Sequence, residues 1–227
     1  MELKWNKQFE YPKSVRELIN EKRHYAIGDE KLPSVTTILS ATQSQEKQDS
    51  LARWKAKVGE NEAERVKNTA GARGTKMHSI LEGYIEGENV LDLTETGGEA
   101  HRMANTIIDQ GFKDLDEIWG SEATLAYPGL YAGATDLVGI YQGRDSIIDF
   151  KQSNKPKKVE WIEDYKLQGA AYATAHDYMF KTSIEQIVIL MCTPDCFFQR
   201  FIINGKEFRE YKWKWLERVN RYYEQKL

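Results

Sequence analysis

Cysteine is scarce in this chain of 227 residues. The two cysteines, Cys192 and Cys196, lie in one short segment, CTPDC. Two thiols are too few for the disulfide framework of a small secreted domain, for a four-cysteine iron–sulfur cluster or for a zinc site built from four thiolates. We therefore predict two buried or half-buried free thiols and no iron–sulfur cluster.

Long apolar runs are also missing. No segment approaches the roughly eighteen residues that a membrane-spanning helix requires. The N-terminus, MELKWNKQFEYPKS, has neither the apolar stretch of a signal peptide nor the Arg-rich, acid-free pattern of a transit peptide. We therefore expect a protein that has no membrane partner and is located in the cytoplasm.

A strong excess of charge of either sign is absent as well, since the formal net charge is −3 at pH 7. This value argues mildly against a protein that coats nucleic acid non-specifically. It does not exclude an enzyme that holds nucleic acid along a local basic groove, because a cluster of metal-binding carboxylates itself lowers the net charge.

Helix and strand signals predict one α/β (or α+β) domain over residues 1–227, in which helices flank a small mixed central sheet. Residues 1–112 are predicted to form a mostly helical N-terminal lobe, and Ser34 is predicted to cap a short helix. Residues 113–227 are predicted to hold the sheet and its helices. The expected elements are two helices within 46–86, the second from about Gly74, a helix over 98–110, three consecutive strands within 117–153, a helix over 159–180, strands at 184–192 and 197–204, and a helix over 206–226.

The segment YAGATDLVGIYQGRDSIIDFKQS, residues 131–153, places charged residues inside apolar strands. A two-residue turn at 143–144 would pair Asp136 with Lys151 across the hairpin. Because side chains alternate along a strand, Asp136, Asp149 and Lys151 would then share one face. Two carboxylates on adjacent strands can share Mg²⁺ or Mn²⁺, and a neighbouring lysine can hold an attacking water. The alternative is a cross-strand ion pair on a solvated face.

Four motifs follow one another along the chain: G-x-x-x-H-x-x-x-E at 74–82, G-x-x-D at 133–136, D-x-K at 149–151 and Q-x-x-x-Y at 168–172. In this order they resemble the PD-(D/E)XK nuclease superfamily, in particular its RecB-like exonuclease branch. Within that branch the likeness is greatest to mitochondrial exonucleases. Two departures stand out: the missing transit pattern suggests a bacterial or phage relative, and the missing cysteine quartet suggests a member without a cluster.

The resemblance implies a restriction-endonuclease-like core and a deoxyribonuclease that depends on Mg²⁺ or Mn²⁺. It implies metal ligands at His78, Asp136, Asp149 and the backbone carbonyl of Phe150, and further catalytic residues at Lys151, Gln168 and Tyr172. Lys151 would assist the water or stabilise the transition state. For His78 the alternative is a surface histidine paired with Glu82, and we assign Glu82 and Glu122 only supporting roles.

A basic loop and an aromatic stripe follow the D-x-K motif. Single-stranded nucleic acid is commonly bound by a positively charged groove with aromatic platforms. The predicted contacts are Lys155, Lys157, Lys158, Trp161 and Tyr165, with Arg73 on the opposite wall. There are two alternatives. The aromatic stripe could belong to the hydrophobic core, and the basic residues of the N-terminal helices, Arg73 among them, could form a solvated surface that binds nothing.

These patterns together predict a metal-dependent DNA exonuclease that prefers single strands or free ends and acts in DNA replication, recombination or repair. Its partners would be DNA and, beside it, replication or recombination proteins. Two alternatives remain open at this point: a structure-specific endonuclease with the same site, and a DNA-binding module without activity.

Overall fold

The structure, a computed structural model, describes residues 3–225 and contains two β-sheets. The strands are β1 (Val15–Ile19), β2 (Lys22–Ile27), β3 (Glu30–Pro33), β4 (Leu115–Tyr127), β5 (Tyr131–Tyr141), β6 (Arg144–Gln152), β7 (Gln186–Cys192) and β8 (Phe198–Asn204). The helices are α1 (Val35–Ala41), α2 (Gln45–Val58), α3 (Glu60–Glu86), α4 (Glu95–Gly111), α5 (Glu163–Phe180) and α6 (Gly205–Glu224), with short 3₁₀ turns η1 (Phe112–Asp114) and η2 (Val159–Trp161).

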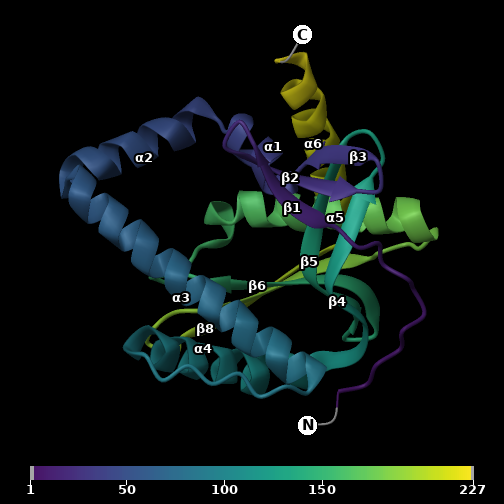
Figure 1. The fold of residues 1–227 in the computed structure, drawn as a ribbon, viewed down its shortest axis with the longest axis horizontal. Coiled ribbons are helices and arrows are strands. Elements are labelled where there is room, and N and C mark those ends of the chain that lie inside the picture. Colours follow the sequence, from purple (N-terminus) through teal and green to yellow (C-terminus); the bar gives the residue numbers. More distant parts are fainter. Residues whose placement is uncertain (1–2, 226–227) are drawn as a thin grey trace.

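The larger sheet has the order β4-β5-β6-β7-β8. Among the five strands of this sheet, β6 and β7 pair in parallel and the other neighbours are antiparallel, and α5 makes the crossover from β6 to β7. Neighbouring residues of one strand enter different cores: Ile147 packs with α1, α5 and α6, whereas Ile148 packs with α3 and α4. The sheet is therefore covered on both faces (Figure 1), and the predicted mixed α/β fold is confirmed.

The N-terminal region differs from the prediction of a helical lobe, because residues 15–33 form the three-stranded sheet β1-β2-β3. The turn between β1 and β2 consists of Asn20 and Glu21, whose φ angles of 50° and 61° are left-handed and match a tight hairpin. This sheet buries Tyr25 and Leu32 against the β4-β5 hairpin. Ser34 caps α1 as predicted, since its side chain accepts a hydrogen bond from the Thr37 N–H.

The turn between β5 and β6 also differs from the prediction. It is formed by Gln142 and Gly143, both with left-handed φ angles (49° and 72°), and Tyr141 pairs with Arg144. The predicted register is thus wrong by two residues. A shift of two preserves the face on which each side chain lies. Continuing the observed register places Asp149, and not Lys151, opposite Asp136.

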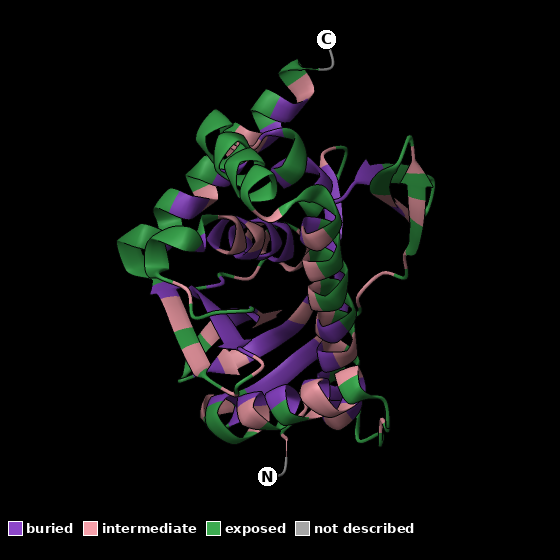
Figure 2. Ribbon diagram, turned by 90° about the vertical axis from the view of Figure 1, so that its left-hand side faces the viewer, coloured by how far each residue is buried: buried purple, intermediate pink, exposed green. Residues whose placement is uncertain are grey.

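Helix α3 is much longer than predicted, because it passes through Gly71 and Gly74 without a break and begins after Gly59. The segment from residue 45 to 72, comprising α2 and the first part of α3, is called the arm below. It extends away from the sheet (Figure 1), most of it is coloured as exposed in Figure 2, and Ala63 is its one buried residue. The arm therefore contributes little to either core.

The remaining elements agree with the sequence prediction to within a few residues. The last helix ends at Glu224, and its predicted end at Lys226 lies outside the described residues. Cys192 is buried and Cys196 half-buried, and both are free thiols as predicted. Among residues 3–225, no helix combines the length and the hydrophobicity needed to cross a bilayer.

Candidate active site

Three acidic residues lie in a row across neighbouring strands. In β4 and β5, Ser121 pairs with Leu137 and Ala123 with Thr135, so Glu122 stands opposite Asp136. On the other side of β5, the register places Asp149 of β6 next to Asp136. Glu122 has a left-handed φ of 45°, an uncommon conformation for a residue within a strand. Such outliers cluster at functional sites, because the surrounding structure must hold them in place.

His78 joins this row from α3. Its Nδ1 lies 3.2 Å from Oδ1 of Asp136. Burial opposes the charged imidazole, but the charge and the hydrogen bond of Asp136 outweigh it and raise the pKa of His78. The corresponding interactions lower the pKa of Asp136 against the effect of its own burial. The two side chains thus form a charge-assisted pair that links α3 to the sheet.

His78, Glu122 and Asp136 each offer a ligand atom, and these three atoms lie within 4.8 Å of one another. One imidazole and two carboxylates form a donor set that suits a divalent cation such as Mn²⁺ or Mg²⁺. Burial, with the negative charges of Asp136 and Glu82, raises the pKa of Glu122 to about 7. Crowded acidic groups of this kind gain from a shared cation. The supporting role predicted for Glu122 therefore understates its position.

Asp149 and Lys151 of β6 lie next to the group formed by His78, Glu122 and Asp136. Asp149 is 2% exposed, and its Oδ2 lies 2.5 Å from the Lys151 ammonium. Burial raises the pKa of Asp149 to about 6, although Lys151 opposes this shift. The predicted sharing of one face is confirmed. The alternative, a cross-strand ion pair on a solvated face, does not match the structure, because Lys151 pairs with Asp149 of its own strand, and Asp149 is buried and Lys151 half-buried.

The backbone between Asp149 and Lys151 is tied to the same cluster. The N–H of Phe150 donates a 2.6 Å hydrogen bond to Oδ2 of Asp136, and the Phe150 ring lies in the core beside His78. This hydrogen bond therefore links β5, which carries Asp136, to β6, which carries Asp149. The Phe150 carbonyl as a metal ligand stays a prediction.

Gln168 and Tyr172 of α5 border the site as predicted. The Gln168 amide donates a 3.2 Å hydrogen bond to the Tyr172 hydroxyl. Both line a cavity of about 410 Å³ that also contains His78, Glu122 and Asp136. Gly133 allows this approach, because a Cβ there would lie 2.7 Å from the Tyr172 ring. Close packing against the Tyr172 ring therefore explains why the G-x-x-D motif has a glycine at residue 133.

The predicted aromatic stripe is only partly correct. Trp161 lies in η2 rather than on α5 and is 61% exposed, with the Lys158 ammonium 5.4 Å from its ring centre. Tyr165 lies on α5 and faces the site, since the Lys151 ammonium is 5.2 Å from its ring centre. The two rings therefore have different settings, one in solvent and one beside the acidic cluster.

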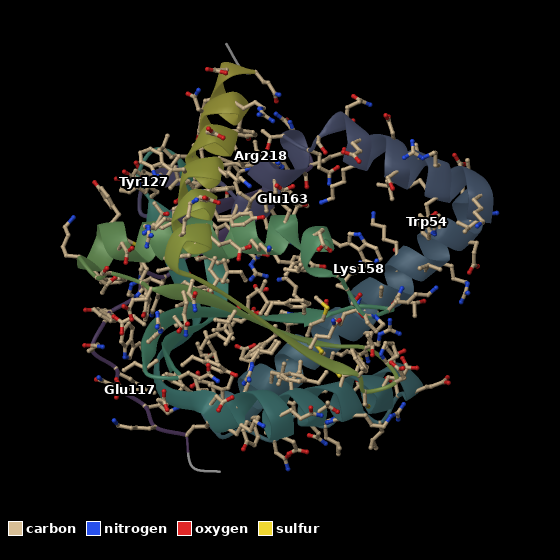
Figure 3. The ribbon with its side chains drawn as sticks, turned by 180° about the vertical axis from the view of Figure 1, so that it is seen from behind. Trp54, Glu117, Tyr127, Lys158, Glu163 and Arg218 are labelled. Carbon is tan, nitrogen blue, oxygen red and sulfur yellow. The ribbon has the colours of Figure 1, made fainter. Side chains whose placement is uncertain are left out.

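A groove of about 550 Å³ lies between the arm and the loop after β6. Trp54 of α2 lines one side, and Lys155, Lys157 and Tyr165 line the other. Figure 3 shows Trp54 and Lys158 on the side of the molecule that the arm occupies. The Gln199 side chain fixes the loop by hydrogen bonds to both the N–H and the carbonyl of Lys157 (2.7 and 2.9 Å).

Arg73 does not have the position predicted for a nucleic-acid contact. It is 6% exposed, and its guanidinium donates hydrogen bonds to Gln152 and Asn154 and forms an ion pair with Glu99 at 3.3 Å. These partners satisfy most of its donors inside the protein. Arg73 therefore anchors α3 to the end of β6 and to α4.

Glu122 is the site residue that sequence reasoning undervalued. The one available signal is a charged residue within the otherwise apolar run EATLAY. Its position opposite Asp136 depends on an irregularity in β4, where the pairing shifts by one residue between Ile118 and Gly120. A bulge of this kind cannot be located from residue periodicity alone.

Comparison with curated proteins finds similarity to mitochondrial genome maintenance exonuclease 1. The Mus musculus protein is 29% identical over 204 residues, covering 85% of this chain and 59% of the relative. The Homo sapiens protein is 27% identical over 205 residues, covering 86% of this chain and 59% of the relative. The chain thus spans about three fifths of the length of these relatives. This similarity supports a relationship to nucleases.

No protein-family model matches the chain. Among solved structures, an exonuclease-like protein of Eubacterium rectale superposes with a TM-score of 0.49 at 16% identity, covering 66% of this chain and 63% of the other. That overlap is too small to establish a shared fold.

Proposed function

We propose that this protein is a metal-dependent DNA exonuclease of the PD-(D/E)XK, RecB-like type. One observation carries the proposal: Glu122, Asp136 and Asp149 from adjacent strands meet His78 and Lys151 in one place. Relatives that are named exonucleases add support. The reaction is hydrolysis of a phosphodiester bond, with roles in DNA replication, recombination or repair.

The donors at the site fit a divalent cation. His78, Glu122 and Asp136 would hold it, and Asp149 with the Phe150 carbonyl would complete its surroundings. When bound, Mg²⁺ or Mn²⁺ supplies Lewis-acid stabilisation of the phosphate charge and lowers the pKa of a coordinated water.

Lys151 acts as a fixed cation. Burial disfavours its charge, but Asp149 and Asp136 outweigh burial and raise its pKa, so the ammonium stays protonated at neutral pH. A protonated lysine cannot accept a proton from water. It can donate hydrogen bonds to the attacking water and to the phosphate oxygens, whose negative charge grows in the transition state.

Gln168 and Tyr172 orient groups at the border of the cavity. Burial raises the pKa of Tyr172, so its hydroxyl remains a neutral donor throughout the working pH range. With Gln168 bonded to that oxygen, the Tyr172 proton is free to reach a substrate atom. The pair thus positions substrate without taking part in proton transfer.

The groove beside the arm suits single-stranded DNA. Lys155 and Lys157 supply positive charge for phosphates, and Trp54 and Tyr165 supply aromatic faces for bases. The exposed Trp161, with Lys158 above it, extends this surface. A strand lying in the groove reaches Lys151, because the Lys151 ammonium contacts the Tyr165 ring.

The test is cleavage of 5′- and 3′-labelled single-stranded and duplex DNA in Mg²⁺, in Mn²⁺ and in EDTA. Wild type should shorten single strands only with metal, and Asp149→Ala and Lys151→Ala should abolish this activity. Lys206→Ala, a change of one exposed lysine on α6, serves as the control and should match wild type. Activity that survives both site substitutions would make the cluster a structural feature. Cutting of closed circular single strands would indicate an endonuclease instead.

A further inference from the structure

Arg23 of β2 lies where two cavities meet. The 410 Å³ cavity lined by His78, Glu122 and Asp136, which are called the acidic cluster below, and a larger cavity of about 860 Å³ share Arg23 and Thr36. The larger cavity lies between the β1-β2 hairpin, α1 and the end of α6. Its other charged lining residues are Lys22 and Glu21. Its volume is within the range of ligand-binding cavities. A strand that passes the acidic cluster therefore meets further space beyond Arg23.

The backbone of Arg23 is held rigidly. Its carbonyl accepts hydrogen bonds from the Ser34 N–H at 2.9 Å and from the Thr37 hydroxyl at 2.8 Å. Ser34 in turn accepts a 3.0 Å hydrogen bond from the Thr37 N–H. These contacts tie the start of α1 to β2 through Ser34 and Thr37. The start of α1 fixes the strand that carries Arg23.

The guanidinium of Arg23, by contrast, is available. The residue is exposed, and within residues 3–225 its side chain forms no ion pair. Arg16, the neighbouring arginine of the same cavity, is already engaged, with Nη2 3.6 Å from Oε2 of Glu122. A fixed backbone and a free planar cation are what recognition of a phosphate requires.

Two helices show that the cavities follow one another. Along α3, Val66 lines the groove beside the arm and His78 lines the cavity of the acidic cluster. Along α5, Tyr165 lines the groove and Gln168 lines the cavity. The hairpin cavity adjoins the cavity lined by His78 and Gln168 through the shared residue Arg23. Basic residues therefore occur at both ends of a path whose middle is the acidic cluster.

We propose that the cavity beside the β1-β2 hairpin holds the terminal segment of the DNA strand that is cut off, and that Arg23, assisted by Lys22, binds its phosphates. This inference rests on the proposed nuclease function and deepens it. The groove beside the arm would then hold the strand that remains. Arg23 is a positioning residue, and the length of the released product depends on the segment that it grips.

The first measurement is equilibrium binding of a fluorescent single-stranded oligothymidylate in Mg²⁺, with Lys151→Ala as the background so that the strand is bound but not cut. Arg23→Ala should weaken binding about tenfold and reduce the slope of log affinity against log salt by about 0.7, the value for one lost contact with a single strand. Arg23→Lys should restore part of the affinity. Arg209→Ala, an exposed arginine of α6 that lines none of these cavities, is the control.

The second measurement locates the contact. Oligothymidylates in which the last few phosphates of the 5′ end or of the 3′ end are neutral methylphosphonates are compared in the same background. Neutral linkages at one end should weaken binding as much as Arg23→Ala does, and should cause no further loss when combined with it. Full additivity at both ends would overturn the proposal, as would an Arg23→Ala protein with the affinity of the Arg209→Ala control.

The third measurement uses the active protein without the Lys151 substitution. Arg23→Ala should change the lengths of the released products while Arg209→Ala leaves them unchanged, and identical product lengths in both would contradict the assignment. Failure of the proposed nuclease function has a different signature, because the wild type would then cleave no strand in any metal.

Discussion

Helices α2 and α5 are of similar length but have opposite relations to the rest of the protein. None of the 14 residues of α2 is buried, whereas nine of the 18 residues of α5 are. A helix as short as α2 is marginal in water on its own. Its local stability must come from its cap at Ser44 and from a few contacts, among them the ion pair of Lys47 with Asp164.

The two helices therefore have different functions in the protein. Helix α5 packs on one face of the sheet and places Gln168 and Tyr172 at the acidic cluster, so a substitution in α5 affects both stability and catalysis. The arm supplies one side of the groove through Trp54 and adds almost nothing to the core. Segments with few buried contacts open at low free-energy cost. The arm is therefore the part that a bound strand can order.

The largest expected effect is on catalysis. Glu122→Gln should lower the single-turnover rate of metal-dependent DNA cleavage by on the order of 10²–10³-fold. Thermal stability should be unchanged or higher, because the substitution removes a charge whose burial raises its pKa. Asp49→Asn on the arm, which also replaces one carboxylate by an amide, should leave the rate within about twofold of wild type. Equal rates for the two variants would exclude Glu122 from the site.

The next effect concerns acid stability and arises from α5. His176 is fully buried, with hydrogen bonds to Tyr11 and Thr182, and burial lowers its pKa to about 4. The unfolded chain binds a proton near pH 6.5 while the folded chain does not, so stability should fall as the pH drops from about 6.5 to about 4. The loss should reach about 3 kcal/mol at pH 4.

Urea unfolding of wild type and His176→Gln between pH 7.5 and pH 4 measures this loss. The variant should be less stable at neutral pH but should show a flatter profile below pH 6.5. His24→Gln, a change on the small sheet, should keep the wild-type profile. A wild-type profile in His176→Gln would mean that another group is responsible.

A pair of glycines tests packing directly. At Gly169 of α5 a Cβ would lie 2.4 Å from the Ile187 side chain, whereas a Cβ at Gly71 of the arm would meet no atom of residues 3–225 within 4 Å apart from the neighbouring backbone of its own helix. Gly169→Ala should therefore destabilise the protein by about 1–3 kcal/mol through overpacking. Gly71→Ala should stabilise it by about 0.5–1 kcal/mol through helix propensity. Denaturant unfolding gives both values, and shifts of the same sign would contradict the distinction between the two helices.

The smallest effect is expected at the contact between the arm and α5. Lys47→Ala removes the ion pair with Asp164 and should change the global free energy of unfolding by less than about 0.5 kcal/mol. Amide hydrogen exchange within residues 45–58 should nevertheless become faster, because local opening loses one of its few restraints. Lys206→Ala on α6 is the matched control. Unchanged exchange in the arm would show that its order has another source.

Much of the site could be predicted from the chain itself, because side chains two residues apart on a strand lie on the same face. The turn lies at 142–143 and not at the predicted 143–144, so the predicted register is wrong by two residues. Asp136, Asp149 and Lys151 nevertheless share a face as expected, because a shift of two residues preserves the face on which each side chain lies. His78 was found through its motif and does pair with Asp136.

Other predictions failed where a residue's role depends on distant partners. Arg73 was expected to face nucleic acid, but Gln152, Asn154 and Glu99 enclose it, and none of them is near it in sequence. Trp161 was expected on α5, but the chain forms η2 before that helix begins. Residues 15–33 were expected within a mostly helical region but form three strands, and the first of their turns, Asn20-Glu21, carries no glycine to mark it.

The sequence by itself determined the alternation of apolar and charged residues, the order of the elements from residue 95 onward and the acidic and basic groups of the site. These are local properties, set by side-chain chemistry and by the periods of helix and strand. Only the tertiary structure decided that Glu122 joins His78 and Asp136, that the arm stands apart from the core, and that Arg23 lies beyond the acidic cluster. Each of those three facts depends on which strands pair and on how the helices pack. No short stretch of the chain fixes strand pairing or helix packing, because both involve residues far apart in the sequence.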